Sequence, residues 1–460
     1  MATKTLRTNV NQTIQDFDSI QQAIIDKGVD VPNGTPTSEY ADKIRTIKSD
    51  GFDTSTITDF SYFGQNNRFG TGENLTGLNT SSGTNFTSMF YSCTSLTTIP
   101  QLDTSNGTSF EQMFDDCTNL TTIPQLDTSN GTYFTSMFRG CTSLTESPQL
   151  NTSIGTDFSD MFAGCTNLTT ITQLDTSSGT NFYEMFYSCT SLTEIPQLDT
   201  SSGTNFHRMF QNCTSLTTIP QLDTSRGTSF EQMFDDCTNL TTIPQLDTSN
   251  GTYFTSMFYG CSSLTEVPQL DTSRGTSFSS MFYNCSNLTT IPQLNTSSGT
   301  SFYNMFSVCT SLTTVPQLDT SSGYNFTSMF AGCSSLTEVP QLDTSSGTFF
   351  VNMFYSCTSL KTIELTSFIS SSNMFSSCTA LENLTVTGTI TVNNSNLDLS
   401  SSPLLTVDSL MSVINALSDN TGGTKYTITL GSTNLAKLTD EQKQIAINKN
   451  YTLAWFFDII

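Results

Sequence analysis

Basic side chains and histidine are scarce in this chain. Lysine and arginine number 16 against 40 aspartates and glutamates, which gives a formal net charge of −24. Nucleic acids and anionic membranes are bound through clustered lysine and arginine, so this charge argues against both partners. His207 is the single histidine, and no serine or cysteine nucleophile accompanies it at a matching site. We expect it to face solvent, and we expect no enzymatic activity and no cofactor.

Long apolar runs are also missing. No segment reaches the roughly 20 apolar residues of a transmembrane helix, and the first residues lack the apolar core of a secretory signal peptide. We therefore expect a protein made in the cytoplasm without a signal peptide and with no membrane insertion. Charged residues make up only 12% of the chain, a composition that favours hydroxyl-rich ladders over ion pairs.

Paired cysteine spacings do not occur, although the chain has 13 cysteines. One cysteine returns every 24 residues from Cys93 to Cys357, and Cys378 follows. An odd number with one cysteine per repeat is not a disulfide framework. A metal site would need histidine partners or closely spaced cysteines. We expect buried, reduced thiols that pack as small hydrophobic groups, and no metal site.

A repeat of 24 residues fills the middle of the chain. Its Met-Phe pair recurs without gap or insertion at Met89, Met113, Met137, Met161, Met185, Met209, Met233, Met257, Met281, Met305, Met329 and Met353. A fixed period of this size predicts a solenoid, in which each coil buries its apolar face against its neighbours. We predict an α/β solenoid with a leucine-rich-repeat-like array of twelve coils. Such an array presents one surface many times, which favours multivalent contact over catalysis.

The apolar residues in the first part of the repeat have helical spacing. Positions i, i+3, i+4 and i+7 are occupied by Phe86, Met89, Phe90 and Cys93. This pattern predicts a helix of about two turns with Thr84 as its N-cap. A glutamate three residues after the threonine completes a capping box in two copies, Thr108/Glu111 and Thr228/Glu231.

The second part of the repeat predicts a very short strand. Leucine or isoleucine recurs at intervals of three from Leu96 onward, the inward rhythm of a leucine-rich coil, with an extended segment over residues 97–99. Pro100 follows and has no N–H to donate, which keeps the strand short. A return turn comes next, in which we expect Gly107 to supply a positive φ.

One turn position carries an acidic column. Its aspartates are Asp103, Asp127, Asp175, Asp199, Asp223, Asp247, Asp271, Asp319 and Asp343. A ladder of carboxylates is a conceivable cation site. The same position holds Asn151 and Asn295 in two copies, and asparagine supports an Asx-turn equally well but lacks the charge. We therefore favour turn capping.

Other exposed positions offer candidate contacts. The residue before Ile/Val alternates between threonine and glutamate, and we take this column as ligand-facing through Thr98, Glu146, Glu194, Glu266 and Glu338. The acidic pairs Asp115/Asp116 and Asp235/Asp236 do not suggest a glycosidase, because adjacent acids on a short exposed helix form a solvated face. Neutral drift at exposed positions is the alternative explanation for this variation.

The ends of the chain differ from the repeats. Residues 1–50 predict a small helical attachment module with helices over 11–27 and 39–47, and residues 51–78 a degenerate capping coil. The repeat solenoid covers 79–384, and 385–460 form a C-terminal leucine-rich-like capping region. We predict short strands over 384–392, 397–407, 426–430 and 451–455, and helices over 409–417 and 439–448, the last capped at its start by Thr439. Candidate attachment residues of the N-terminal module are Ile14, Phe17, Ile20, Ile24, Tyr40 and Ile44.

The repeat resembles the BspA-type leucine-rich repeat. The string Asp-Thr-Ser-x-Gly-Thr-x-Phe-x-x-Met-Phe-x-x-Cys-x-x-Leu-Thr-x-Ile/Val carries the resemblance over roughly residues 79–384. It implies a leucine-rich-like fold and adhesion to host or neighbouring surfaces, without enzymatic activity. The Pro-Gln that follows Ile/Val in most copies departs from the common pattern.

The N-terminal module resembles the start of phage tail-fibre and other minor virion proteins, through residues 24–36 and 40–44. This implies attachment to other virion proteins, and the plain alternative is a helical cap over the first coil. Our leading hypothesis is a virion surface fibre that contacts a bacterial surface glycan or protein, as a possible homo-oligomer. The alternatives are a bacterial BspA-like adhesin, a capsid fibre and a ligand-free spacer.

Overall fold

The computed structural model describes residues 54–67, 70–72, 75, 77–393 and 396–455. The chain forms two compact units, Met1–Leu216 and Thr217–Ile460. The expected helical module at residues 1–50 lies outside the described residues. The boundary between the units falls inside the regular repeat, and the unbroken period of the sequence gives no sign of it.

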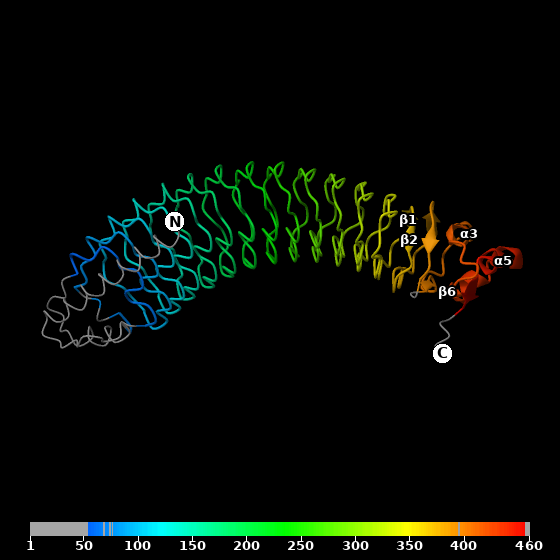
Figure 1. Ribbon diagram of the computed structural model, residues 1–460, viewed down its shortest axis with the longest axis horizontal. Coiled ribbons are helices and arrows are strands. Elements are labelled where there is room, and N and C mark those ends of the chain that lie inside the picture. The colour runs from blue at the N-terminus through cyan, green and yellow to red at the C-terminus, as the bar shows by residue number, and fades with distance from the viewer. Residues whose placement is uncertain (1–53, 68–69, 73–74, 76, 394–395, 456–460) are drawn as a thin grey trace. The chain divides into compact units, whose positions relative to one another are not determined.

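Each unit contains 24-residue coils that lie side by side (Figure 1). Parallel bridges join residues 24 apart. In the first unit they connect Asn85, Ser109, Tyr133, Asp157, Asn181 and Asn205, and in the second Ser229, Tyr253, Ser277, Ser301, Asn325 and Phe349. The predicted solenoid of stacked repeats is therefore confirmed within each unit.

The repeats contain no α-helix, so the predicted helix over Phe86–Cys93 is wrong. Within residues 79–360, all of which the structure describes, the segment forms turns. The N–H groups of Met89 and Cys93 donate to carbonyls three residues back, at 3.2 and 3.1 Å. The N–H groups of Ser88 and Phe90 instead donate to the next coil, to the carbonyls of Glu111 and Met113. We call the stretch Thr84–Cys93, and its equivalents, the turn segment.

Left-handed residues explain why no helix forms. Ser88 and Ser92 both have φ near +55°, and every later turn segment up to residue 357 carries such residues at one or both equivalent positions. Left-handed residues interrupt an α-helix, and two successive four-residue turns bury the same four positions as a helix does. Phe86, Met89, Phe90 and Cys93 are indeed buried. The prediction that these four positions are buried is thus confirmed, although the backbone that carries them forms turns and not a helix.

The predicted N-caps are also wrong, because there is no helix to cap. Thr108 Oγ donates at 3.1 Å to the carbonyl of Thr84 in the preceding coil, and Thr252 donates likewise to Thr228. These threonines connect coils. They form a hydroxyl ladder that a capping box would not provide.

Two columns of phenylalanine rings run through the core. Phe86 stacks on Phe110 with ring centroids 5.7 Å apart, and Phe90 stacks on Phe114 at 5.6 Å. All four rings are fully buried. Each stacked pair adds about 0.5–1.5 kcal/mol beyond the area that it buries. The repetition of this contact fixes the register of neighbouring coils.

The turn glycines are required by these rings. A Cβ on Gly131 would lie 2.7 Å from Phe134 Cζ and 2.9 Å from Phe110 Cε2. Gly107 is crowded in the same way, and its φ is not positive. The expectation that Gly107 supplies a positive φ is therefore wrong. The glycine is needed because the chain passes too close to the stacked rings for any side chain.

A buried threonine column satisfies the backbone beside the core. Thr104 is buried, and its Oγ donates at 2.8 Å to the carbonyl of Asp127 in the next coil. Thr128 makes the equivalent bond to Asn151 at 2.7 Å. Each coil therefore offers its neighbour a hydrogen bond where a buried carbonyl would otherwise lack a donor.

The thiols are buried and free, as predicted. All 13 cysteines lie among the described residues, and none forms a disulfide. Cys117 Sγ lies 3.1 Å from the carbonyl of Phe90 in the preceding coil. Burial raises the pKa of the Cys165 thiol to about 12. A thiol with this pKa is protonated and unreactive at neutral pH.

The opening coil continues the core. Phe60 is buried and stacks on Phe86 at 5.7 Å, as the prediction of a degenerate coil requires. Phe63 does not occupy the second ring position and instead meets Phe60 edge-on. Gly64 takes that position, and its carbonyl accepts a contact from Cys93 Sγ.

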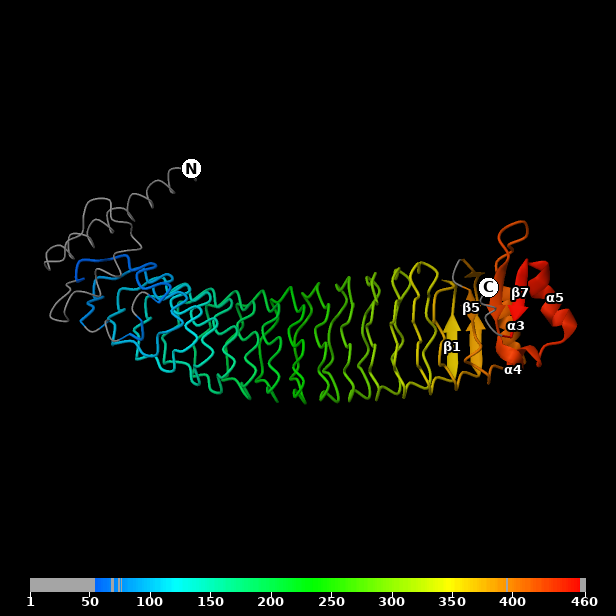
Figure 2. The ribbon, with the colours of Figure 1, turned by 90° about the horizontal axis from the view of Figure 1, so that it is seen from below.

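The C-terminal region contains regular strands and helices (Figure 2). The strands are β1 Thr362–Leu365, β2 Phe368–Ile369, β3 Asn383–Val386, β4 Ile390–Thr391, β5 Leu397–Asp398, β6 Tyr426–Thr429 and β7 Tyr451–Ala454. The helices are α3 Val407–Ala416, α4 Gly431–Leu435 and α5 Asp440–Asn448. All strand pairs are parallel: β1 with β3, β2 with β4, and β6 between β5 and β7.

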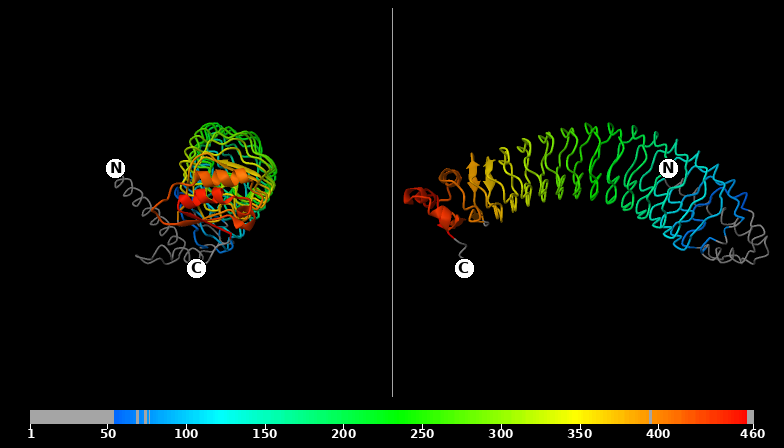
Figure 3. Two further views of the ribbon diagram at one scale, coloured as in Figure 1. Left: turned by 90° about the vertical axis from the view of Figure 1, so that its right-hand side faces the viewer. Right: turned by 180° about the vertical axis from the view of Figure 1, so that it is seen from behind.

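The helices cover the C-terminal end of the second unit (Figure 3). Helix α3 packs on β3, and α5 packs on β7. Thr439 and Gln442 form a capping box at the start of α5, as predicted for the helix at 439–448. The predicted strand over 384–392 is split into β3 and β4, and the one over 397–407 is confined to β5. Each described helix is too short or too polar to cross a bilayer.

The close approach of glycine to the ring column gives a direct stability test. We expect Gly131→Ala to lower the free energy of unfolding by about 1–3 kcal/mol, because the new methyl group overpacks the core. Thr122→Ala, which changes an exposed position of a neighbouring coil, should have little effect. Urea unfolding followed by circular dichroism measures both variants. Equal stability of the two would contradict the crowding.

Candidate binding surfaces of the repeat

The predicted ligand-facing column is exposed. Its residues Thr98, Glu146, Glu194, Glu266 and Glu338 all lie on the surface of their coils. Isolated bridges join Glu146 to Thr170 and Glu338 to Thr362, so the predicted strand shrinks to single bridged residues. This column lies on what we call the strand-like side of each coil, residues 97–103 and their equivalents.

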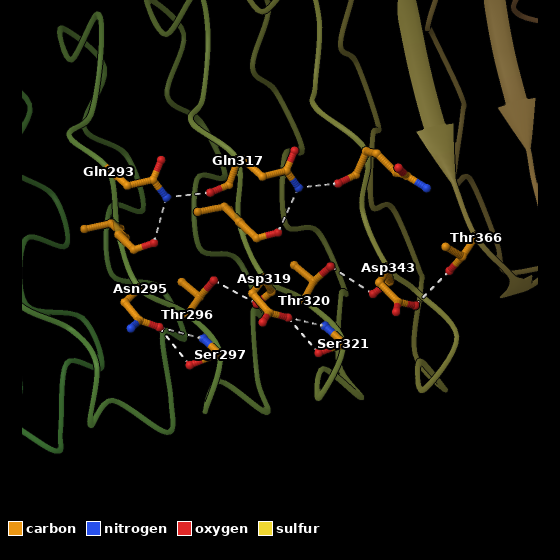
Figure 4. Close-up of a pocket in the computed structure, with 13 residues that line it drawn as sticks. Gln293, Asn295, Thr296, Ser297, Gln317, Asp319, Thr320, Ser321, Asp343 and Thr366 are labelled. Carbon is orange, nitrogen blue, oxygen red and sulfur yellow. Dashed lines mark hydrogen bonds between the residues drawn. The ribbon is translucent and has the colours of Figure 1, made fainter.

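An open groove lies on the strand-like side in each unit, across three or four successive coils. In the second unit it has a volume of about 810 Å³ (Figure 4), and in the first unit an equivalent groove has about 750 Å³. We call it the Gln–Asp groove. Its polar lining in the second unit comes from Gln293, Asn295, Thr296, Ser297, Gln317, Asp319, Thr320, Ser321, Gln341, Asp343 and Thr366.

The glutamines of the groove are locked in one orientation. Gln293 Nε2 donates at 3.0 Å to the carbonyl of Leu294 and at 2.7 Å to that of Gln317 in the next coil. Gln317 repeats the pattern toward Gln341 (Figure 4). Both amide hydrogens are therefore used, and Oε1 is left as an acceptor. In the sequence, a glutamine follows Ile/Val-Pro in most repeats without an evident reason. Its role in joining neighbouring coils is visible only from the hydrogen bonds between them.

The aspartate column forms Asx-turns, as predicted. Asp319 Oδ1 accepts the N–H of Ser321 at 3.1 Å and its Oγ–H at 2.6 Å. Asn295 accepts the same two donors from Ser297, which confirms that asparagine serves equally well. At Asp343, these hydrogen bonds lower the pKa of the carboxyl, Ser345 contributing most. Among the described residues no three histidine, cysteine, aspartate or glutamate side chains gather as a metal site.

The groove is thus a surface of hydrogen-bond acceptors. Each coil adds a glutamine Oε1 and usually a carboxylate, and the glutamine Nε2–H groups are used in hydrogen bonds to backbone carbonyls of the protein. Partners rich in hydroxyl, amide or ammonium donors match this arrangement. The match repeats once per coil.

The turn segments of the first unit contain a charged cluster, and here one prediction is wrong. Asp115 was expected on a solvated face but is fully buried, and neither of its oxygens has a hydrogen-bond partner. Asp235 is buried as well. Because the segment is not helical, adjacent residues do not share an outward face. Arg139 Nη1 lies 3.8 Å from Asp115 Oδ2.

Burial sets the protonation of this cluster. It raises the pKa of Asp115 to about 7, against the opposing effect of Arg139 and with help from nearby acids. Burial and the neighbouring Glu184 raise the pKa of Asp160 to about 6. Glu184 itself pairs with Arg208 at 3.1 Å.

His207 does not project into solvent as expected. It is half-buried, and its ring meets that of Tyr183 edge-on at 5.4 Å. Stacking of successive coils brings the two rings together. The six candidate attachment residues, Ile14, Phe17, Ile20, Ile24, Tyr40 and Ile44, lie outside the described residues.

The stacked coils define the class of the protein, a leucine-rich, BspA-like repeat protein. The chain belongs to the family described as "Mycoplasma protein of unknown function, DUF285", whose matches cover residues 37–149, 108–218, 136–242, 205–314 and 276–387. Together these matches span more than half of the 460 residues. No curated protein matches the chain.

Solved leucine-rich repeat structures are similar to parts of the chain. A leucine-rich repeat protein of T. pallidum has 18% identity and a TM-score of 0.23, over 48% of this chain and 79% of that one. A leucine-rich repeat protein from Eubacterium ventriosum has 17% identity and a TM-score of 0.31, over 64% of this chain and 84% of that one. An internalin of Listeria monocytogenes has 16% identity and a TM-score of 0.19, over 58% of this chain and 80% of that one. At these TM-scores the similarities add nothing on function.

The raised pKa of Asp115 predicts a pH dependence of stability. The folded protein binds this proton more tightly than the unfolded chain, so the stabilisation is complete below the unfolded pKa of 3.8 and is lost as the pH rises through about 7. We expect Asp115→Asn to remove most of this pH-dependent loss of stability, which is on the order of 4 kcal/mol at most. Part should remain through Asp160.

Urea unfolding at pH 5 and pH 8 tests this directly. The wild type should be less stable at pH 8, and Asp115→Asn should flatten the difference. Asp127→Asn serves as control, because hydrogen bonds from Ser129 lower the pKa of that exposed carboxyl. A wild-type pH slope that Asp115→Asn leaves unchanged would contradict the assignment.

Proposed function

We propose that this protein is a bacteriophage virion surface protein, a tail fibre or other surface fibre, that contacts the bacterial host through its repeats. The observation that carries the binding role is the Gln–Asp groove, which presents the same acceptors in register on successive coils. The partner is a bacterial surface glycan or protein that offers matching donors. No catalysis is involved.

Repetition supplies the affinity. One coil offers only an amide oxygen, a carboxylate and the neighbouring threonine or glutamate, which makes a weak contact. When a first coil has bound, the next acts on the same ligand at a high effective concentration, so overall binding exceeds that of any single coil by orders of magnitude. A repetitive cell-surface polymer suits this arrangement.

The virion assignment is supported by the N-terminal sequence, which resembles the start of phage tail-fibre and minor virion proteins. In this proposal the N-terminal module binds other virion proteins or further copies of this chain, and the repeats face the host. The protein is made in the host cytoplasm and resides on the particle surface. Placement on the head as a capsid fibre is a variant of the same proposal.

The second candidate is a bacterial BspA-like surface adhesin, which the repeat family favours. Immunogold electron microscopy with an antibody against the turn segments separates the two. Label on phage particles supports the virion proposal and shows whether the protein sits on tail or head. Label confined to cell envelopes would overturn it and favour the adhesin.

The role of the strand-like side is tested by cell binding. We expect Glu266→Thr combined with Glu338→Thr to weaken binding of the purified full chain to host cells by at least tenfold. Threonine occupies the same column in other coils, such as Thr98, so the fold should be retained. The variant removes two carboxylates of the ligand-facing column, which lies on the same strand-like side as the groove.

A matched control removes two charges from the turn segments instead, through Glu111→Gln and Glu231→Gln. It should bind as the wild type does. Flow cytometry of cells with labelled protein gives both affinities. Unchanged binding by the glutamate-to-threonine variant would favour the ligand-free spacer or place the contact elsewhere.

A further inference from the structure

The turn segments of the second unit change character along the chain. The segment at 228–237 carries Glu231 and two aspartates. The next five segments, at 252–261, 276–285, 300–309, 324–333 and 348–357, contain no aspartate, glutamate, lysine, arginine or histidine. In a chain with 40 acidic residues, a neutral surface over five successive coils is a distinct feature.

Aromatic side chains are exposed on this neutral surface. Tyr324 and Phe349 are 46% and 53% exposed, and their rings meet edge-on at 6.3 Å. Tyr303 is 42% exposed one coil earlier. Tyr259 and Tyr283 stack at 4.6 Å. We call the exposed group Tyr303, Tyr324 and Phe349 the aromatic platform. Exposed rings on three successive coils of a neutral surface are candidates for an interaction site.

Hydrogen-bonding groups alternate with the rings. Asn325 lies between Tyr324 and the core residue Phe326, and its Oδ1 accepts the N–H of Thr327 at 3.1 Å. Asn304 follows Tyr303 in the chain with φ +54°. Serine hydroxyls lie beside them, for example Ser301, which bonds Ser279 at 2.8 Å. The surface therefore combines flat apolar rings with neutral amides and hydroxyls.

We propose that the aromatic platform binds an uncharged glycan. The C–H face of a sugar ring packs on the electron-rich face of tyrosine or phenylalanine, and the hydroxyls around its edge match amides and serines. A charged partner finds no counter-charge on these five segments, and the net charge of −24 repels an anionic polymer.

A protein partner fits this surface less well. The centre of a protein interface is a contiguous, fully desolvated apolar patch. Here the contacting ring pair Tyr324–Phe349 stands among the asparagine, serine and threonine residues of the same turn segments. The platform lies on the turn segments, and none of its three residues lines the Gln–Asp groove. Its glycan binding therefore stands without the virion assignment and without the binding proposed for that groove.

The test uses the full chain and soluble neutral polysaccharides as probes: a β-glucan, a mannan and a galactan, with polygalacturonate as the anionic comparison. Affinity electrophoresis and isothermal titration calorimetry measure binding. The platform variant combines Tyr303→Thr, Tyr324→Thr and Phe349→Ser. Each new residue occupies the same column in other coils, as Thr87, Thr84 and Ser109 do, so the fold should be preserved.

We expect the wild type to bind at least one neutral probe, and the platform variant to lose at least tenfold in affinity. Tyr133→Ser, at an equally exposed tyrosine of the first unit, should bind as the wild type does. Binding of no neutral probe, or equal binding by the platform variant, would overturn the proposal. Dimerisation that the platform variant abolishes, without glycan binding, would also overturn it and make a second copy of the chain the occupant.

Discussion

The stacking of phenylalanine rings from coil to coil is the constraint on which the rest of the structure depends. Rings of one column lie between 5.4 and 6.2 Å apart throughout both units. This contact excludes any side chain at the turn glycine, and it holds the turn segments close enough for their N–H groups to bond the next coil. Buried threonine hydroxyls then complete the backbone bonding. A single coil has none of these partners, so each is stable only against its neighbours.

Sequence reasoning identified the period, the buried positions and the thiols, because side-chain burial follows directly from residue type and spacing. It failed on the backbone of Phe86–Cys93, since helical turns and four-residue left-handed turns bury the same positions. Polar serines at positions such as Ser88 and Ser92, with glycine at Gly140, were the available signal for positive φ. The burial of Asp115 and the orientation of Gln317 depend on contacts between coils and have no local signature.

The two surfaces follow from the same core. Because stacking fixes the residues at the core positions, sequence variation is confined to the exposed columns. A substitution there changes the surface of the coil and leaves its core unchanged. The strand-like side keeps its glutamines and aspartates nearly constant and presents acceptors. The turn segments vary from a charged cluster around Asp115 to the neutral aromatic platform. A solenoid of this kind is suited to contact with an extended or repetitive partner.

The left-handed turn segment is tested most directly at Val308, where φ is +64°. A β-branched residue is disfavoured there by roughly 1–2 kcal/mol, whereas glycine adopts this φ freely, as Gly332 does in the next coil. We predict that Val308→Gly raises the midpoint of urea unfolding, while Ser307→Gly, at a residue without positive φ, lowers it. If both variants are destabilised alike, as glycine destabilises a helix interior, the segment is helical and the stacked-turn account is wrong.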